Sequence, residues 1–336
     1  MEKKQHKRKK TIKVFEAFAG YGGASYGLKR SGIKYKVIGF SEIEPSADRI
    51  LHHNFPTIHN YGNIISIRED LERNPNAIPD FDLFTGGFPC QPFSSAGLML
   101  GENDKKGRGT LIYDIIRICQ IKRPDYILLE NVRGFLADRF KETRAALQEG
   151  LKDYHFRMQV LNSKDYGIPQ NRERLWIFAS RKEFPMEFSM VPPMPEEERP
   201  RLKVFLDKTP PDDVYLSDNQ VEHLQEVHGK HGLKNFVVEE PLCLDIYNHK
   251  IKTDGLCNTI TEPSHNITRI IEPLGIDGKL RVRKLSIPEQ FRLMGFEDDE
   301  ISFPDDLNYR EISARAGNGW DVNLVGLLLK HIFSQL

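Results

Sequence analysis

A cysteine held between two prolines is the residue of this chain best suited to act as a nucleophile. Cys90 lies in the stretch GGFPCQPFS, Gly86–Ser94, directly after the apolar run Phe81–Thr85. The apolar run predicts a buried strand, and the glycines and prolines after it predict a loop with little conformational freedom. An open α/β sheet carries its chemistry where such strands end. The stretch by itself favours a nucleophile only modestly, because free cysteine is also a common buried residue.

Two more candidate strands have charged residues near their ends. Glu130 follows the apolar run Tyr126–Leu129, and Arg172 and Arg174 precede the run Leu175–Ala179. A carboxylate at the end of a buried strand is costly unless it is paired or used. The two arginines alternate with the period of a strand, so both can point to one face. Together these residues predict a reactive site, although a paired strand-end acid and two surface arginines would give the same pattern without chemistry.

The first candidate strand leads into a glycine-rich turn. Thr11–Phe18 is followed by Ala19–Gly23 and then by the helical segment Ala24–Ser31. The next strand, Tyr35–Phe40, ends at Ser41-Glu42. Glu42 lies about 20 residues beyond the turn, which is the spacing of an acid that binds a ribose hydroxyl. The pattern predicts a cofactor that contains adenosine. It does not distinguish a nicotinamide cofactor from S-adenosylmethionine.

Strands and helices alternate along the chain, which predicts an α/β fold: a Rossmann-like sheet with helices on both faces. A third strand is expected to end at Gly62–Ile64, and another at Phe156–Leu161. Helices are expected at Pro45–His53, Leu111–Ile121, Phe140–Leu151, Arg283–Phe296 and Asp321–Phe333.

A change of composition near Phe184 predicts the domain boundaries. Between Met186 and Leu280 the chain holds ten Lys and Arg against seventeen Asp and Glu, with many prolines and little periodicity. We therefore divide the chain into a basic, disordered tail at 1–10, a first domain at 11–184, a smaller inserted domain at 185–280, and a return to the first domain at 281–336.

The overall composition limits the class of protein. The 336 residues are 39% hydrophobic and 29% charged with a formal net charge of zero, so no global field attracts a polyanion. No run approaches the roughly 20 apolar residues that span a bilayer. The four cysteines, Cys90, Cys119, Cys243 and Cys257, form no CxxC pair. We expect a reduced cytoplasmic compartment, no disulfide framework and no metal.

Taken in order, these motifs resemble the DNA (cytosine-5) methyltransferases of bacteria and phages, from about Thr11 to the C-terminus. The motifs that carry the resemblance are Phe18–Gly23, Glu42, Pro89–Gln91, Arg108–Leu111, Glu130–Val132, Gln170 with Arg172 and Arg174, Arg283–Phe296, and Gly317-Asn318. Each motif is weak or moderate alone, but the ordered set is specific. The resemblance implies that 11–184 binds S-adenosylmethionine and that 185–280 is a target-recognition domain.

The resemblance gives the charged residues a shared reaction. Cytosine C5 is a poor nucleophile, and a thiolate that adds at C6 converts it into an enamine carbon that can attack a methyl sulfonium. Cys90 would be that thiolate, Glu130 would face N3 of the base, and Arg174 would contact O2 with Arg172 beside it. Both faces of the base must be reached, which requires that the cytosine be flipped out of the duplex.

The resemblance also implies the contacts of cofactor and DNA. S-adenosylmethionine, which leaves as S-adenosylhomocysteine, would contact Phe18, Gly20, Gly22, Gly23, Glu42, Ile43, Asn63, Ile64, Leu111 and Asn318. The DNA would contact Gln91, Ser94, Ser95, Arg108, Thr259 and Thr261. Asn63 stands where the family usually has Asp, and its carbonyl can still accept from the adenine amino group.

The preferred interpretation is therefore a DNA (cytosine-5-)-methyltransferase, a one-carbon transferase of a restriction-modification system, acting as a monomer beside a separate restriction endonuclease. A tRNA cytosine-5 methyltransferase and a catalytically silent DNA-binding relative are the alternatives. A nicotinamide dehydrogenase would explain the glycine turn and Glu42 but would leave the Pro-Cys-Gln loop without a role.

Overall fold

The computed structural model describes residues 11–89, 111–183, 189–228, 238–263, 268–274 and 278–336. These residues form two compact units. The first unit holds the described residues up to Val160 together with Arg174–Val191 and Val325–Leu336, and the second holds Leu161–Glu173 and Pro192–Leu324.

The first unit is built on a six-stranded sheet with the order β2-β1-β3-β4-β7-β5. Its strands are β1 (Ile12–Ala17), β2 (Tyr35–Ser41), β3 (Leu83–Gly87), β4 (Tyr126–Val132), β5 (Tyr154–Asn162) and β7 (Glu173–Arg181). The β2-β1, β1-β3 and β3-β4 pairs are parallel, and the β4-β7 pair is antiparallel. The mainly parallel sheet with helices confirms the predicted α/β class.

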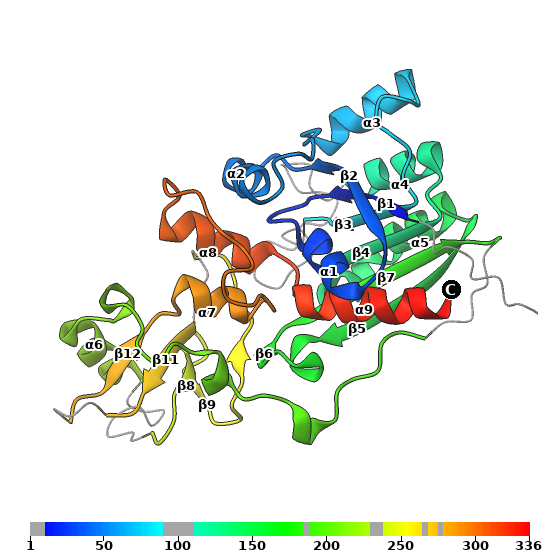
Figure 1. Ribbon diagram of the computed structural model, residues 1–336. Coiled ribbons are helices and arrows are strands. Elements are labelled where there is room, and N and C mark those ends of the chain that lie inside the picture. The colour runs from blue at the N-terminus through cyan, green and yellow to red at the C-terminus, as the bar shows by residue number, and fades with distance from the viewer. Residues whose placement is uncertain (1–10, 90–110, 184–188, 229–237, 264–267, 275–277) are drawn as a thin grey trace, which may run out of the picture. The chain divides into compact units, whose positions relative to one another are not determined.

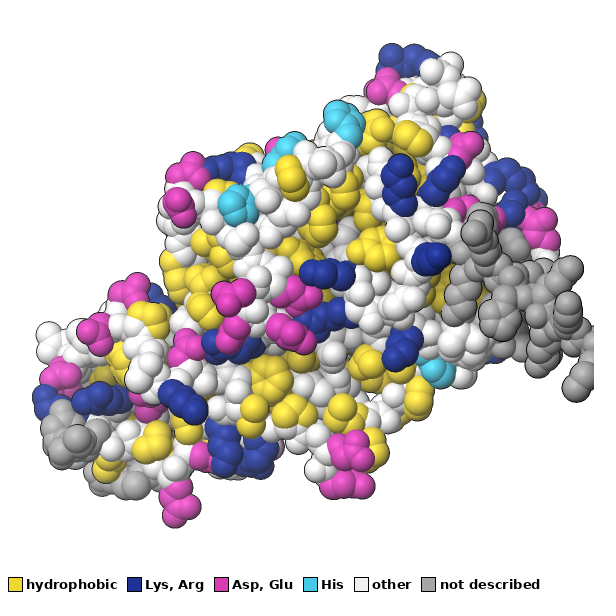
Figure 2. Space-filling model, viewed as in Figure 1, with side chains coloured by type: hydrophobic (Ala, Val, Ile, Leu, Met, Phe, Trp, Pro, Cys, Tyr) yellow, Lys and Arg dark blue, Asp and Glu magenta, His cyan; other side chains and the backbone are white. Residues whose placement is uncertain are grey.

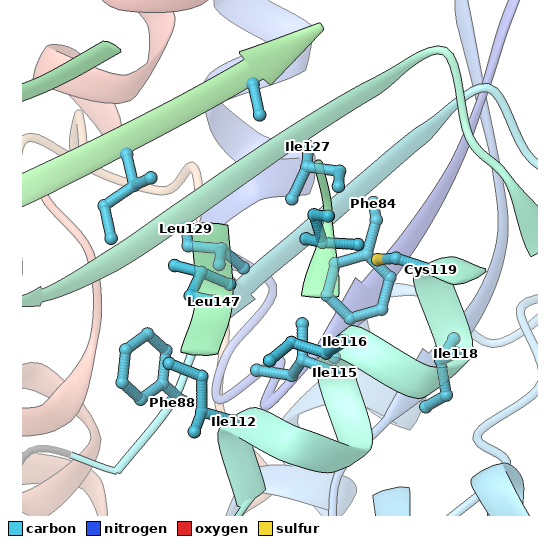
Figure 3. Packing of buried hydrophobic residues seen from close by; sticks show 14 of the residues in the cluster. Phe84, Phe88, Ile112, Ile115, Ile116, Ile118, Cys119, Ile127, Leu129 and Leu147 are labelled. Atoms are coloured by element: carbon cyan, nitrogen blue, oxygen red, sulfur yellow. The ribbon is translucent and has the colours of Figure 1, made fainter. Parts of the chain in front are cut away.

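Helices cover both faces of this sheet (Figure 1). They are α1 (Gly23–Ser31), α2 (Pro45–Asn54), α3 (Ile64–Arg73), α4 (Leu111–Lys122), α5 (Lys141–Gly150) and α9 (Val322–Gln335). Apolar residues of α3, α4 and α5 form one buried cluster with β1, β3, β4 and β7, where Phe84, Ile115, Leu129 and Leu147 interlock (Figure 3). On the other face Phe333 of α9 packs on the rings of Tyr126 and Phe178. Because both faces are buried, the strands read as continuous apolar runs.

The direction of the connections reverses between the neighbouring strands β1 and β3. From β1 the chain crosses to β2 on one side, and from β3 it crosses to β4 on the other. Ligands of open α/β sheets bind in the crevice outside the carboxyl ends of the strands at such a reversal. The ends of β1, β3 and β4 are in register there, with Ala17 beside Gly86 and Gly87 beside Glu130.

Two predicted elements differ from the structure. The strand expected to end at Gly62–Ile64 is absent from this described segment: Asn60 forms only an isolated bridge with Phe40, and α3 begins at Ile64. Asn63 caps that helix and Gly62 has a φ of 75°, which breaks an extended run. The helix expected over Arg283–Phe296 is shorter, because Arg283 ends a strand and a Ser286–Glu289 capping box starts the helix at Ile287.

The second unit has two small sheets and its own core. A four-stranded antiparallel sheet has the order β12-β11-β8-β9, and β6 and β10 form a parallel pair. Its elements are β6 (Gln170–Asn171), β8 (Leu242–Asp245), β9 (Lys250–Lys252), β10 (Cys257–Asn258), β11 (Thr268–Glu272), β12 (Arg281–Arg283), α6 (Asp218–His228), α7 (Ile287–Arg292) and α8 (Tyr309–Asn318). Leu244, Ile271 and Val282 are central to its buried cluster.

The second unit overlaps the segment predicted to recognise DNA. It contains the described residues of 192–280, and it also takes in 161–173 and 281–324. None of the helices that the structure describes is long and apolar enough to cross a membrane.

Candidate active site

The turn after β1 has a backbone that demands glycine. Gly20 and Gly22 have φ values of 59° and 90°, and Phe18 also lies in the left-handed region at 52°. A Cβ at Gly22 would lie 2.7 Å from the Phe55 ring, whereas a Cβ at Gly20 would meet no described atom within 4 Å. As far as the described residues go, the space beside Gly20 is thus open, and a side chain there would fill it.

A buried carboxylate holds the helix that follows this turn. Glu16 accepts hydrogen bonds from the Ala24 amide at 2.8 Å, the Ser25 amide at 3.0 Å and the Ser25 hydroxyl at 2.5 Å. Burial raises the pKa of Glu16 to about 7, although these hydrogen bonds act in the opposite direction. Glu16 therefore fixes the start of α1 at the cost of a desolvated carboxyl group.

Glu42 holds the other end of the turn. Its Oε2 accepts from the Gly20 amide at 2.8 Å, and its Oε1 accepts from the Ile43 and Glu44 amides, each at 2.8 Å. The predicted ribose acid therefore lies next to the glycine turn, as the spacing required. Two carboxylates, Glu16 and Glu42, position the same short segment.

The other predicted cofactor residues of the first unit lie in different environments. Asn63 Oδ1 accepts from the Ile65 amide at 3.0 Å, which leaves the carbonyl a second lone pair. Ile64 is buried in the core cluster and Gly23 opens α1, while Phe18 packs against that cluster from its edge. Ile43 is 69% exposed. Leu111, the first residue of α4, also packs against the cluster.

These residues suit an uncharged adenosine and an amino acid moiety better than a pyrophosphate. The open space at Gly20 admits a ligand against the backbone, the Glu42 carboxylate is an acceptor for hydroxyl groups, and the exposed Ile43 offers an apolar surface. Among the described residues, no group of three His, Cys, Asp or Glu side chains could hold a metal ion.

The chain leaves β3 at the same edge of the sheet as the glycine turn after β1. Five predicted site residues that follow, Cys90, Gln91, Ser94, Ser95 and Arg108, lie outside the described residues. The backbone just before them is held by Asn131, a fully buried residue at the end of β4. Its Nδ2 donates to the Phe88 carbonyl at 3.4 Å, and its Oδ1 accepts from the Val132 amide at 2.8 Å.

Glu130 and Arg174 form an ion pair at the carboxyl end of β4. Arg174 Nε lies 2.9 Å from Glu130 Oε1, and the two side chains are 12% and 16% exposed, Glu130 being the more buried. In the antiparallel β4-β7 pair Glu130 is opposite Trp176 and Arg174 is opposite Val132, so the charged residues are diagonal neighbours on one face.

Arg172 lies between two strands and has partners of its own, although strand periodicity predicts that both arginines point to one face. β6 ends at Asn171 and β7 begins at Glu173, so the alternation is interrupted at Arg172. Its buried guanidinium donates to three carbonyl oxygens of the second unit, those of Ile260 at 3.1 Å, Gly317 at 3.1 Å and Gly319 at 2.7 Å. The structure therefore gives Arg172 and Arg174 separate sets of partners.

Three separately predicted motifs converge around Arg172 within the second unit. Thr259 donates its hydroxyl to the Asn171 carbonyl at 2.5 Å, and α8 presses Gly317 against the backbone of Thr261, where no Cβ would fit. Asn318 donates from Nδ2 to Glu262 at 2.6 Å. The Gln-x-Arg motif thus joins the threonine segment to the Gly-Asn motif.

Sequence reasoning gives no structural role to three residues that support this architecture. Gln170, fully buried, accepts from the Ile260 amide at 2.9 Å and donates to the Leu293 carbonyl at 2.6 Å. Asn131, like Gln170, belongs to a motif whose pattern does not reveal what its side chain holds. Glu16 carries a detectable signal, because it is the one acid in the apolar strand TIKVFEAF.

Comparisons with known proteins agree with these motifs. The family model described as C-5 cytosine-specific DNA methylase matches residues 12–334. The type II methyltransferase M.NlaIV of Neisseria lactamica is 36% identical over 228 residues, covering 61% of this chain and 52% of that protein. The chain therefore spans about half the length of the first such relatives. M.Bsp6I of Bacillus sp. strain RFL6 is 29% identical over 340 residues, with 97% and 99% of the two chains covered.

Solved structures show the same fold at low sequence identity. A crystal structure of Spodoptera frugiperda DNMT2 matches with a TM-score of 0.72 and 20% identity, over 96% of this chain and 100% of that chain. A putative DNA modification methyltransferase encoded within an Escherichia coli prophage matches with a TM-score of 0.63 and 19% identity, over 96% and 99% of the chains. Since the family model spans nearly every residue, this chain belongs to the C-5 cytosine-specific DNA methylases.

Proposed function

We propose that this protein transfers a methyl group from S-adenosylmethionine to C5 of a cytosine flipped out of a specific duplex DNA sequence. One observation carries the proposal: the Glu130–Arg174 ion pair lies at the end of β4, in register with the strand that leads into the Pro-Cys-Gln loop. Membership of the family and the names of its type II relatives support the choice of DNA.

The reaction assigns one task to each reactive side chain. The Cys90 thiolate adds to C6 of the cytosine, and the displaced electron pair makes C5 the nucleophile. Glu130, as a carboxylate, accepts from the exocyclic amino group, and in its protonated form it donates to N3, where negative charge develops. Arg174 holds the Glu130 side chain and donates to O2 of the base. After methyl transfer, loss of the C5 proton allows the thiolate to leave.

The cofactor site is proposed at the end of β1. S-adenosylmethionine, when bound, supplies an electrophilic methyl group on a sulfonium. Gly20 lets the ligand lie against the backbone, Glu42 accepts from ribose hydroxyls, and Asn63 offers a carbonyl to the adenine amino group. Phe18, Ile43 and Leu111 add apolar contacts. Glu16 keeps the start of α1 in place beside this site.

We assign Arg172 a positioning role in place of a contact to the base. Its three carbonyl partners hold the segment that carries Thr259 and Thr261, which would contact the backbone of the flipped nucleotide. Asn318 acts beside them through Glu262. The proposed recognition domain, 185–280, selects the DNA sequence, and the protein serves restriction-modification in the cytoplasm of a bacterium or a phage-infected cell.

The test is to measure transfer of a labelled methyl group from S-adenosylmethionine to duplex DNA and to tRNA. We expect labelled duplex DNA only, and bisulfite sequencing of DNA from expressing cells should then give the modified base and its context. Cys90→Ala should abolish transfer while S-adenosylmethionine still binds in a calorimetric titration. Labelling of tRNA alone would refute the proposal, and absence of any transfer by a protein that binds the cofactor would point to a silent DNA-binding relative.

A further inference from the structure

The second unit carries a short hairpin with an exposed tip. β8 and β9 pair with Cys243 opposite Lys252 and Asp245 opposite Lys250, and residues 246–249 form the connecting turn. β8 is an inner strand of the four-stranded sheet, and its Leu244 packs in the core cluster with Ile271 and Val282. The hairpin is therefore anchored at its base by a buried strand.

A single carboxylate fixes the conformation of the tip. Asp245 is 7% exposed, and its Oδ1 accepts from the amides of Tyr247 at 3.0 Å and Asn248 at 2.9 Å. Its Oδ2 accepts from Asn248 Nδ2 at 2.9 Å. His249 then adopts a φ of 52°, which closes the turn. Because these bonds are local, the tip keeps its shape without a partner and loses little entropy when it binds one.

The side chains at the tip are apolar and basic. Tyr247 is 76% exposed, the highest value among the exposed large hydrophobic side chains of the described residues. Lys250 and Lys252 follow on β9, and the segment from residue 246 to residue 253 contains no acid. The second unit as a whole has an excess of acids, and Figure 2 shows basic and acidic side chains interspersed on the face it presents. The hairpin is thus locally positive.

Edge lysines have a simpler explanation, which does not cover the tyrosine. β9 is the outer strand of its sheet, and lysines on an outer strand prevent pairing with other chains. That function needs no exposed aromatic ring and no preformed turn. Tyrosine at an exposed position is typical of binding surfaces, since a rigid ring supplies contact area at a low cost in entropy.

We propose that the Tyr247–Lys250 tip enters a groove of duplex DNA and contributes to the choice of sequence. The major groove admits a two-stranded β-ribbon, and the base edges there offer hydrogen bonds and thymine methyl groups to a tyrosine. Lys250 and Lys252 face the phosphates beside it. This inference rests on the proposed function and deepens it, because it names the element of this chain that distinguishes the target from other duplexes.

Three substitutions test the tip. Tyr247→Ala removes the base contact, and Lys250→Ala and Lys252→Ala each remove one phosphate contact. The assay is kcat/KM for methyl transfer to duplexes that contain the modified site of the wild-type enzyme or single-base changes in it. We expect Tyr247→Ala to lower kcat/KM for the cognate duplex by about five- to a hundredfold. The ratio of kcat/KM for the cognate duplex to that for one of the changed duplexes should also become smaller. Each lysine variant should weaken binding to all duplexes alike and make the slope of log K against log salt shallower by about 0.9.

Matched controls come from the same unit. Val204, 69% exposed, and the exposed Lys208 lie outside the hairpin, so Val204→Ala and Lys208→Ala should leave kcat/KM and the salt slope unchanged. All variants should keep the wild-type melting temperature and affinity for S-adenosylmethionine, since Tyr247 is exposed. Lys250→Glu provides a second test, because charge reversal should weaken DNA binding more than alanine does.

The outcomes separate the two proposals. If wild-type protein methylates DNA and the hairpin variants keep its rate, salt slope and site preference, the tip is not the contact and this inference is wrong. If the tip variants bind duplex DNA as the wild-type protein does but lose binding to tRNA or to another protein, duplex DNA is not the partner of the tip and this inference is wrong. If the wild-type protein methylates no DNA, the proposed function itself fails.

Discussion

Glu130 and Arg174 face each other from neighbouring strands, with 2.9 Å between Oε1 and Nε. Neither strand end could hold its charge alone, because a buried carboxylate or guanidinium without a partner costs several kcal/mol. The pair therefore places a carboxyl group at the rim of the sheet in one orientation. The same contact that stabilises the ends of β4 and β7 prepares the group that would engage the base.

The Glu130–Arg174 arrangement predicts a specific kinetic defect. Glu130→Gln keeps the size of the side chain but removes the proton donor and the negative charge, so we expect kcat to fall by about 10²- to 10⁴-fold. Single-turnover methyl transfer measures this loss, and calorimetry should show unchanged affinity for S-adenosylmethionine. If Glu130→Gln retained the wild-type rate, Glu130 would have no role in the reaction.

Arg172→Lys should be primarily a stability defect. A lysine can satisfy at most some of the three carbonyls that Arg172 binds, so we expect a loss of about 2–4 kcal/mol in the free energy of unfolding. Urea unfolding of the variant measures it. Arg199→Lys in the same unit is the control, because Arg199 is only partly buried and should lose less. If Arg172→Lys kept the wild-type stability but lost the rate of methyl transfer, Arg172 would have a direct catalytic role.

Two glycines with similar backbones should respond differently to alanine. Gly20 and Gly32 have φ values of 59° and 71°, and at neither position would an added Cβ meet a described atom within 4 Å. Each substitution therefore costs about 1 kcal/mol of backbone strain. Only Gly20→Ala should weaken S-adenosylmethionine binding, by about tenfold or more, since its methyl group would fill the proposed cofactor space. Equal affinities of the two variants for S-adenosylmethionine would show that the cofactor does not bind beside this turn.

Glu16 predicts how stability changes with pH. Its pKa of about 7 in the folded state lies above the ordinary value of 4.5, so the folded state binds the proton more tightly than the unfolded chain does. Its contribution is fully present below pH 4.5 and is lost as the pH rises through 7, by up to about 3 kcal/mol. Glu42 raises this pKa further by repulsion.

The check is urea unfolding at several pH values between about 5 and 8, which brackets the titration of Glu16. Glu16→Gln should flatten the decline in stability seen in the wild-type protein over this window. The exposed Glu44→Gln, in the same unit, should leave the decline unchanged. A decline of the same size in the wild-type protein and in Glu16→Gln would exclude Glu16 as its source.

Local patterns predict the central strands well because these strands are buried on both faces. β1, β3 and β4 are mainly apolar runs whose charged residues lie near their ends, and a run of this kind has few alternatives. The third expected strand is wrong because Asn63 caps a helix there, and a capping side chain outweighs a short extended segment.

The partners of Arg172 are not predictable from its own neighbourhood. Two of its acceptors are carbonyl groups 88 and 145 residues further along the chain, and a backbone carbonyl has no sequence signature. The partner of Glu130 is easier to predict. A charged side chain at the end of an apolar strand must find a partner nearby, and Arg174 lies on the adjacent strand.

The last helix has a consequence for the order in which the protein can fold during synthesis. α9 lays Phe333 on Tyr126 and Phe178, and Val325 against Gly27 of α1, so the first unit needs residues from both ends of the chain. The ribosome makes all of residues 192–324 before it makes most of that helix. The second unit can therefore form while the aromatic face of β4 and β7 is still uncovered, and a premature stop before Val325 would leave that face exposed to aggregation.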